Sequence, residues 1–302
     1  MSRSPVASSA AAGALIAPAA RQWLTGLTAG RVLHTFEAAA YLVDQDGGVL
    51  LLARPPLGPG PFTLVLESSA FDFQAVLTVG EGVSSSAGEL VADGWRVDAT
   101  SARVWNPRPA WETLRRRGSS LREGLDAVRQ AVLKQGPRGP FGRLLTGSAV
   151  PTAVDTIEDR LEARAREGAT RLAGALASGP RGQLEMAAAE LAGLGSGFTP
   201  SGDDFLMGAM FAQWTTRPAA AARRLSGVIA KAASPRTTTV SAAWLQAAAR
   251  GEASLLWHAL VDALAAGDEA RIAKTARGIL ETGHTSGEDA IAGFLRSIEP
   301  GL

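Results

Sequence analysis

The sequence contains no cysteine and only three histidines, His34, His258 and His284. The lack of cysteine excludes thiol nucleophiles, disulfides and cysteine-ligated metals. No two histidines have the H-x-x-x-H spacing that places two zinc ligands on one helix face. Zinc-dependent hydrolysis is therefore not expected, and we assign no metal site. The sequence leaves any cofactor unknown.

A net charge of one sign and long apolar runs are lacking as well. The 30 basic and 29 acidic residues nearly cancel, so no overall field favours nucleic acid or an anionic membrane as a partner. No stretch reaches the roughly 18 strongly apolar residues of a membrane span. The first 20 residues are Ala/Ser-rich, with alanine rather than leucine in the middle and Leu15 and Ile16 as their only leucine and isoleucine, which is too little for a typical signal peptide. We expect a cytoplasmic protein.

Two regions of the chain differ in their hydrophobic pattern. Over residues 31–106, short apolar runs are separated by glycine, proline and acidic turns. Ala38–Val43 and Val49–Leu52 flank a turn and predict a hairpin, and Phe73–Val79 alternates as a strand does. About five to seven such strands predict a small antiparallel sheet or a barrel-like domain.

From residue 107 onward the apolar residues recur at helical spacing. The steps of three and four residues over 111–132 predict one amphipathic helix. The fold class is therefore α+β, with a small β-rich domain followed by a larger helical one. We expect a flexible N-terminal segment at 1–30, the β-rich domain at 31–106 and the helical domain at 107–302. Further helices are expected at 154–178, 181–193, 202–215, 219–233, 238–250, 253–266, 268–281 and 287–298.

A glycine-rich, acidic turn occurs twice in the helical region. Residues 195–208 read GSGFTPSGDDFLMG, and residues 283–293 read GHTSGEDAIAG. When Pro200 is omitted, six positions are identical and a seventh exchanges Asp for Glu. We infer a pair of similar local structures rather than a solenoid.

One interpretation of each copy is helix capping alone. Ser201 and Ser286 are good N-caps, and Asp204 and Asp289 then fall at the third helical position, where a carboxylate completes a capping box. In the second copy this interpretation and a functional one are about equally supported. In the first copy Gly195, Gly197, Thr199 and Asp203 exceed what a cap requires, and sites concentrate on such loops.

The residue types indicate a small ligand with two different faces. Glycines at 195 and 197 let the loop expose consecutive N–H groups, which suit a carboxylate or a phosphate. Paired aspartates suit a cation, an amide or another hydrogen-bond donor. The loop lacks the lysine of a P-loop and the glycine spacing of a dinucleotide site. A third hydroxyl-rich segment at 235–241 includes Arg236, which could clamp an anion or simply precede a helix cap.

The candidate site residues come from these three segments. We expect catalytic roles for Asp203, Asp204 and Asp289. We expect substrate-binding roles for Gly195, Gly197, Thr199, Ser201, Gly202, Arg236, Thr238, Ser241, Thr285, Ser286 and Gly287.

The string GLGSGFTPSGDDFLMG at 193–208 resembles the hallmark of the AllH-like family, and 237–252 and 285–289 lie where that family has its other motifs. The resemblance is specific over about 190–295 and looser over the β-rich part. It implies a role in ureide and allantoin catabolism, in which an AllH-type subunit acts with two partner proteins. The implied reaction, oxamate carbamoyltransfer, interconverts oxalurate plus phosphate with oxamate plus carbamoyl phosphate. His284 departs from the small residue expected there, so it receives no role.

Three hypotheses follow for the function. The leading one is a subunit of a multi-protein carbamoyltransferase that binds a small anionic substrate and partner subunits. The second is a non-catalytic subunit that binds a small anion or supports assembly. The third is a metal-dependent phosphotransferase in which Asp203, Asp204, Glu288 and Asp289 meet around Mg²⁺.

Overall fold

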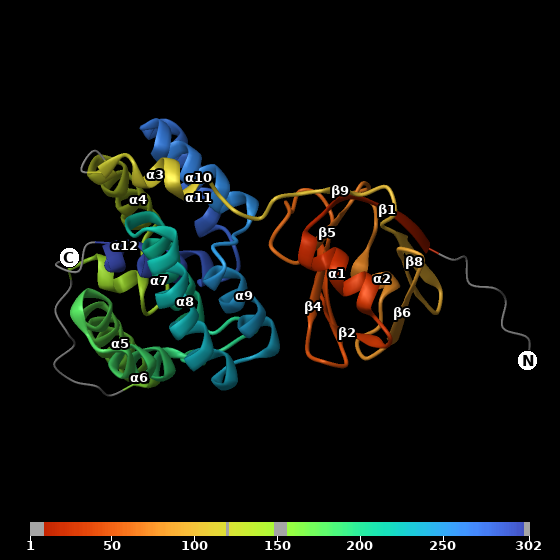
Figure 1. The fold of residues 1–302 in the computed structure, drawn as a ribbon, viewed down its shortest axis with the longest axis horizontal. Coiled ribbons are helices and arrows are strands. Elements are labelled where there is room, and N and C mark those ends of the chain that lie inside the picture. Colours follow the sequence, from red (N-terminus) through yellow and green to blue (C-terminus); the bar gives the residue numbers. More distant parts are fainter. Residues whose placement is uncertain (1–8, 119–120, 148–155, 299–302) are drawn as a thin grey trace, which may run out of the picture. The chain divides into compact units, whose positions relative to one another are not determined.

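The computed structural model describes residues 9–118, 121–147 and 156–298, and it consists of two compact units that divide between Pro107 and Arg108. The first unit is a β-barrel and the second is helical (Figure 1). The predicted α+β class, with the smaller β-rich part first, is confirmed. The division lies one residue after the boundary that the composition indicates.

The barrel is a closed ring of eight strands in the described residues. The strands follow the order β5-β4-β3-β2-β6-β7-β8-β1, and β1 pairs with β5 to close the ring, while β9 lies in parallel beside β1. Closure removes the exposed edges of an open sheet. The elements are β1 (Ser9–Ile16), α1 (Pro18–Gly26), β2 (Gly30–Thr35), β3 (Ala39–Asp44), β4 (Val49–Ala53), β5 (Thr63–Leu66), α2 (Phe73–Val76), β6 (Gly82–Ser86), β7 (Glu89–Ala92), β8 (Trp95–Asp98) and β9 (Arg103–Val104).

The strand that closes the barrel lies in the segment expected to be flexible. The first half of β1 pairs with β8, and its second half pairs with β5. At Gly13 the strand approaches β5 so closely that a Cβ would lie 2.7 Å from Leu64 Cδ1. Helix α1 then buries Trp23 and Leu24 in the barrel core. The expectation of a flexible segment is therefore wrong for 9–30, because small residues here serve close strand packing; residues 1–8 lie outside the described part.

The region after β5 also differs from its predicted structure. Phe73–Val76 forms the short helix α2, not a strand. The reason is local: the Asp72 carboxylate accepts hydrogen bonds from the backbone N–H groups of Gln74 and Ala75, which is N-capping. Phe73 is buried beside Phe71 in the barrel core, so its hydrophobicity reflects burial and not strand alternation.

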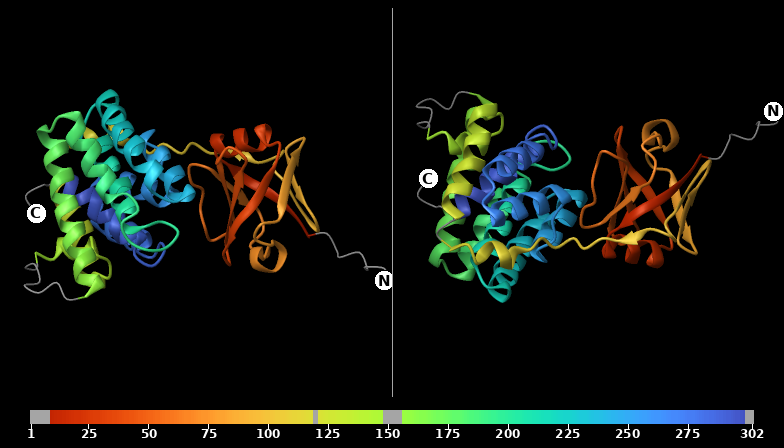
Figure 2. Two further views of the ribbon diagram at one scale, coloured as in Figure 1. Left: turned by 90° about the horizontal axis from the view of Figure 1, so that it is seen from below. Right: turned by 90° about the horizontal axis from the view of Figure 1, so that it is seen from above.

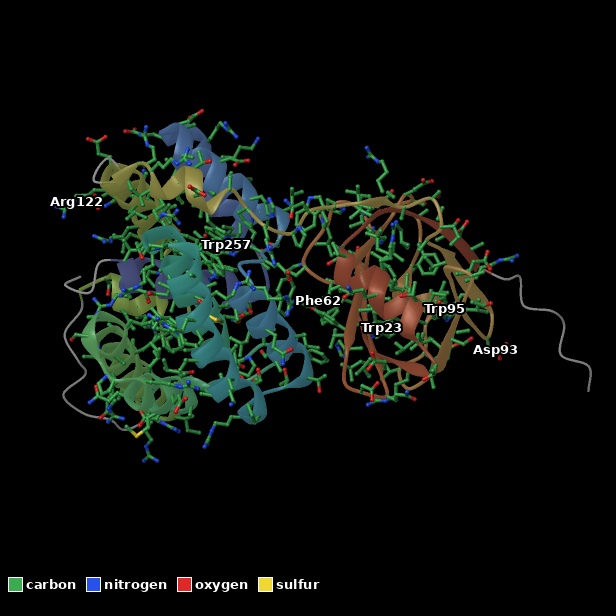
Figure 3. The ribbon with its side chains drawn as sticks, in the orientation of Figure 1. Trp23, Phe62, Asp93, Trp95, Arg122 and Trp257 are labelled. Atoms are coloured by element: carbon green, nitrogen blue, oxygen red, sulfur yellow. The ribbon has the colours of Figure 1, made fainter. Side chains whose placement is uncertain are left out.

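Two tryptophans anchor the core of the barrel. Trp95 of β8 is 1% exposed and Trp23 of α1 is 7% exposed (Figure 3). Trp23 Nε1 donates to the carbonyl oxygen of Gly48 at 3.0 Å, which satisfies its polar atom inside the core. The hydrophobic clusters of the two units are separate, so each unit has its own core.

The helical unit matches the predicted helices closely. The predicted helix over 111–132 is interrupted, because Gly118 has a positive φ of 55° that a helix does not accept. The start predicted for the next helix, at Val154, lies outside the described residues. The elements are α3 (Trp111–Arg115), α4 (Leu121–Gln135), η2 (Gly142–Leu145), α5 (Ile157–Ser178), α6 (Arg181–Leu191), α7 (Ser201–Thr216), α8 (Ala219–Ala233), η3 (Ser234–Arg236), α9 (Thr239–Ala249), α10 (Leu255–Ala266), α11 (Glu269–Leu280) and α12 (Ser286–Ile298).

Helix α7 is buried on all sides at the centre of this unit. The ring of Phe211 in α7 lies 4.8 Å, between centroids, from that of Trp257 in α10, and the ring of Trp257 lies 5.5 Å from that of Phe294 in α12. A helix that is apolar all round belongs in a protein interior, so the polar residues of its first turn are also placed inside. Among the described residues, none of the helices is both long and apolar enough to cross a membrane.

Candidate functional site

The two copies of the repeated turn meet where α7 and α12 pack together. A Cβ on Gly208 of α7 would overlap the carbonyl oxygen of Ala290, and a Cβ on Gly293 of α12 would overlap that of Phe205. Gly208 and Gly293 are equivalent positions in the repeat, as are Phe205 and Ala290. The contact is therefore reciprocal, and the two helices cross with local pseudo-two-fold symmetry. The missing side chains permit this close crossing.

The loops that precede the two helices lie side by side, after α6 and after α11 (Figure 2). Thr199 Oγ1 and Ser286 Oγ are 3.0 Å apart, and Ser201 Oγ and Thr285 Oγ1 are 3.5 Å apart. Each pair joins the threonine of one copy to the serine of the other. We call this region, which consists of Thr199, Ser201, Asp204 and their counterparts Thr285, Ser286 and Asp289, the acid junction.

The serines do not cap their helices as expected. Helix α7 is preceded by Pro200 and has no side-chain cap, and α12 begins at Ser286 itself. The capping-box interpretation is therefore wrong for the first copy, and in the second copy the serine is the first helical residue. The hydroxyls instead face the other copy, because the tight crossing at the glycines brings the two helix starts together.

Two buried aspartates occupy the centre of the acid junction. Asp204 is 6% exposed and Asp289 is 0% exposed. Asp204 has the hydroxyls of Ser286 and Thr199 as partners, and Asp289 has those of Ser201 and Thr285. In each, the Oδ2 atom is buried without a hydrogen-bond partner. Buried polar atoms are rarely left in this state, so the two Oδ2 atoms mark a place for a donor.

Burial shifts the ionisation of both aspartates in the same direction. Desolvation raises the pKa of Asp204 well above its ordinary value, against the hydroxyl of Ser286, and the Asp289 charge raises it further. Desolvation also raises the pKa of Asp289, to about 7, against the hydroxyls of Ser201 and Thr285. Burial thus favours the protonated form of both carboxyl groups, and the charge of Asp289 adds to this effect at Asp204.

The first acidic residue of each copy faces away from the acid junction. Asp203 accepts a hydrogen bond from Gly193 N at 3.0 Å and another from Thr237 Oγ1. Glu288 accepts from the backbone N–H groups of Arg138 and Gly139 at 3.0 and 2.9 Å. Desolvation raises the pKa of Asp203, and the Thr237 hydroxyl opposes it. These two acids therefore fix the segments that surround the junction.

The segment at 136–142 is a wall of the site that sequence reasoning missed. A Cβ on Gly139 would lie 2.8 Å from Asp289 Oδ1, so glycine alone lets the backbone pass over this carboxylate. Phe141 N donates to the same oxygen at 3.4 Å. The alternation of glycine and proline over 136–142 is a signal for a tight loop, but nothing in it points to a partner about 150 residues away.

The hydroxyl-rich segment at 235–241 supports the glycine loop from the other side. Thr238 caps α9 through Ser241 N and donates to the carbonyl oxygen of Phe198 at 2.8 Å. The buried Ser241 Oγ lies next to Asp203 without a well-formed hydrogen bond. Arg236 is exposed, and its carbonyl group packs against Gly193. This segment thus adjoins Asp203, and the structure does not bring Arg236 into the acid junction.

At the helix starts and in the glycine loop, some backbone N–H groups donate hydrogen bonds within the chain and others do not. Those of Gly202, Asp203 and Asp204 donate to carbonyl groups of the preceding loop, and that of Gly287 donates to Thr282. The exposed loop residues Gly195, Ser196 and Gly197 donate to no other described residue from their N–H groups. Positive φ angles of 113° at Gly195 and 98° at Gly197 give this loop the shape of an anion-binding nest. The helix starts themselves offer little to an anion.

The four acidic residues do not converge on one point. Asp203 and Glu288 are directed to separate neighbouring segments, and in the described residues no group of three or more His, Asp or Glu is arranged to hold a metal ion. The hypothesis that all four meet around Mg²⁺ is therefore wrong in its geometry. The acid junction thus contains the carboxyl groups of two aspartates and the hydroxyl groups of two serines and two threonines.

The fold and the junction define a two-unit α+β protein whose helical unit carries a duplicated Gly-Ser-acid motif. Residues 191–298 match the family model described as oxamate carbamoyltransferase subunit AllH. The matched segment is a little more than a third of the chain and contains both copies of the motif together with α9. The resemblance seen at 193–208 is thus confirmed over this segment. No curated protein and no solved structure matches the chain.

Proposed function

We propose that this chain is a subunit of an oxamate carbamoyltransferase and that its acid junction, with the adjoining glycine loop, binds a small anionic amide. The family match over 191–298 supports the subunit assignment. The observation that carries the site is the pair of buried, unpartnered Oδ2 atoms on Asp204 and Asp289. They adjoin a loop with open N–H groups at Gly195 and Gly197.

The two parts of the site suit the two faces of such a substrate. Loop N–H groups can hold a carboxylate or phosphate without a basic side chain. The unpartnered carboxylate oxygens can accept N–H groups from an amide or ureide, and they cannot hold an anion unless they are protonated. Oxamate and carbamoyl phosphate each carry an anionic group and an NH₂ group. A ligand of this class therefore satisfies atoms that the chain leaves unsatisfied.

In the proposed reaction the amide nitrogen of oxamate attacks the carbonyl carbon of carbamoyl phosphate. A C–N bond forms, the C–O bond to phosphate breaks, and the nitrogen loses one proton. Asp204 or Asp289 accepts this proton as a general base, and the leaving phosphate then takes it up. Open N–H groups near Gly197 stabilise the oxyanion that develops on the carbonyl oxygen. Asp203 positions the loop through Gly193 and does not touch the substrate.

Substrate access requires a local movement. Ser201, Asp204 and Asp289 are all less than a tenth exposed, whereas the loop residues at 195–197 are exposed. The glycine loop must shift for a ligand to reach the Oδ2 atoms, and glycines at 195 and 197 make such a change inexpensive in steric terms. Contact with partner subunits is a suitable trigger for the shift.

The test is Asp204→Asn in the complex reconstituted with its partner subunits. The variant keeps the shape of the side chain but not its basicity, so we expect turnover to fall by at least about 100-fold, as for loss of a general base. Asp262→Asn changes an exposed aspartate of α10 and is the matched control. Normal turnover of a correctly folded Asp204→Asn complex would disprove a catalytic role of Asp204, and the same result for Asp289→Asn would disprove the acid junction as the source of the base.

A second candidate function is a non-catalytic subunit that binds the substrate or supports assembly. The deep burial of both aspartates favours it, because a catalytic group usually meets its substrate at a more open surface. In that case Asp204→Asn would weaken oxamate binding or complex assembly while the turnover rate at saturating substrate stays within about two-fold of the wild type.

A further inference from the structure

We propose that the loop between Gly193 and Thr199, together with the side chain of Arg236, forms a phosphate-binding subsite next to the acid junction. Its part in catalysis, to hold the phosphate group of carbamoyl phosphate, rests on the function proposed above. The binding of phosphate itself concerns this chain alone and is testable without partner subunits.

The two copies of the repeated turn differ in length. A Cβ on Gly202 would overlap the carbonyl oxygen of Leu191, eleven residues earlier in the chain. In the second copy, a Cβ on Gly287 would overlap the carbonyl oxygen of Ile279, only eight residues earlier. The first copy therefore has three more residues over the same structural span, and Pro200 is one of them.

The other two additional residues lie at the tip of the loop. Contacts make Gly195 the equivalent of Gly283, because an added Cβ on either glycine would contact the serine of the same copy. Between this glycine and the threonine of the acid junction lie residues 196–198 in the first copy and His284 alone in the second. The second copy packs without a longer tip, so the helix crossing does not account for the extra length.

The segment before α9 fixes both ends of this loop. At the start of the loop, an added Cβ on Gly193 would lie 2.6 Å from the carbonyl oxygen of Arg236. At its end, Thr238 Oγ1 donates to the carbonyl oxygen of Phe198 at 2.8 Å. The tip is thus held at both ends, while the N–H groups of residues 195–197 donate to no other described residue. An ordered set of open N–H groups binds an oxyanion at little cost in loop entropy.

Arg236 adds a positive charge to these N–H groups. Its side chain is exposed, and the described residues give it no ion pair. Because its carbonyl group touches Gly193, the side chain starts at the base of the loop. Loop N–H groups alone accept a carboxylate or a phosphate. A guanidinium group binds phosphate through two parallel N–H bonds, and phosphate carries more negative charge than a carboxylate near neutral pH. The subsite therefore selects phosphate.

The subsite complements the acid junction in the proposed reaction. Thr199 follows the tip directly, and its hydroxyl lies 3.0 Å from Ser286 Oγ, so the loop leads from the surface into the junction. A phosphate group at the tip lets the NH₂ end of carbamoyl phosphate face the unpartnered Oδ2 atoms. The tip is exposed, so phosphate reaches it without the movement that access to the buried aspartates requires. The chain alone should therefore bind phosphate.

The experiment is a titration of the full-length chain with inorganic phosphate at constant ionic strength, followed by nitrogen-15 amide NMR. We expect saturable shifts of the amides at 195–198. Arg236→Gln keeps the backbone contacts and should raise the Kd for phosphate at least about ten-fold, as for loss of a charged hydrogen-bond partner. Arg224→Gln changes an exposed arginine of α8 and should leave the Kd unchanged. Absence of saturable binding, shifts confined to other segments, or equal Kd values in the two variants would overturn the proposal.

Two further ligands test the selectivity. Oxamate has a carboxylate in place of phosphate and should shift the same amides more weakly, whereas carbamoyl phosphate should compete with phosphate for them. Equal affinity for oxamate and phosphate, or binding of carbamoyl phosphate elsewhere, would contradict the subsite. Because this titration uses no partner subunit and no turnover, its failure is distinguishable from failure of the Asp204→Asn test of the proposed function.

Discussion

Asp204 of α7 and Asp289 of α12 are equivalent residues of an internal repeat, and each has a serine of the other copy as a hydroxyl partner. The hydroxyl group of Ser286 pairs with Asp204, and that of Ser201 pairs with Asp289. The repeat is therefore not two independent helix caps. It forms one buried structure whose halves complete each other.

The pH dependence of stability tests the burial of Asp289. Its pKa rises from 3.8 to about 7 on folding, so the folded chain binds more protons than the unfolded chain between these values. Stability must then fall as pH rises through this window, by up to about 1.4 kcal/mol per pH unit for one proton. Raised pKa values at Asp203 and Asp204 act in the same direction.

This dependence is measured by urea unfolding at several pH values for the wild type and Asp289→Asn. The difference between the two chains isolates the residue from the other titrating groups. We expect the difference to change across the window and to favour the variant at the upper end. Parallel stability curves would contradict an unusual ionisation of Asp289.

The glycine crossing predicts a large effect from a single methyl group. Gly208→Ala places a Cβ onto the carbonyl oxygen of Ala290, so we expect a loss of about 1–3 kcal/mol or more in the free energy of unfolding. Gly227 is an exposed residue of α8 where an added Cβ meets nothing within 4 Å. Gly227→Ala should therefore stabilise the chain by up to about 1 kcal/mol. Equal effects of the two changes on thermal unfolding would disprove the close crossing.

The link between Glu288 and the segment at 136–142 is testable locally. Glu288→Gln exchanges one acceptor oxygen for a donor, so the N–H groups of Arg138 and Gly139 lose part of their hydrogen bonding. We expect their amide hydrogen exchange to become faster by roughly ten-fold or more, equivalent to at least about 1.4 kcal/mol. Glu281→Gln alters an exposed residue after α11 and should leave these amides unchanged. Unaltered exchange in Glu288→Gln would refute the link.

The barrel makes a prediction of its own. Trp23→Ala removes a buried indole and its hydrogen bond to Gly48, which should cost about 3–5 kcal/mol. The effect should appear in the barrel, because its core is separate from that of the helical unit. Tryptophan fluorescence and exchange of the β4 amides report it. A variant as stable as the wild type would show that α1 is not part of the barrel core.

Much of the fold could be predicted from local patterns. The 219–233 helix is predicted with the observed bounds, because Pro218 precedes it and alanines and apolar residues recur at helical spacing. The β3–β4 hairpin was equally readable from its Gly-rich turn. The closure of the barrel could not be predicted from the sequence, because the Ala-rich β1 resembles a flexible tail until its pairing with β5 and β8 is known.

The candidate site was predictable only as a set of positions. The repeat identified Asp204 and Asp289 as equivalent, yet a capping box accounts for the same residues without any contact between the two copies. Only tertiary contact between α7 and α12 turns Ser201 toward the other copy. The contribution of Gly139 depends on a contact about 150 residues distant in sequence, and no local pattern encodes that contact.

Hydrogen-exchange footprinting of the reconstituted complex with oxamate, with and without carbamoyl phosphate, tests the central claim most directly. If the acid junction and glycine loop form the substrate site, amides at 195–199 and 283–287 become protected together, and Asp204→Asn weakens this protection while Asp262→Asn preserves it. Protection confined to other parts of the chain, or to the partner subunits, would contradict the account.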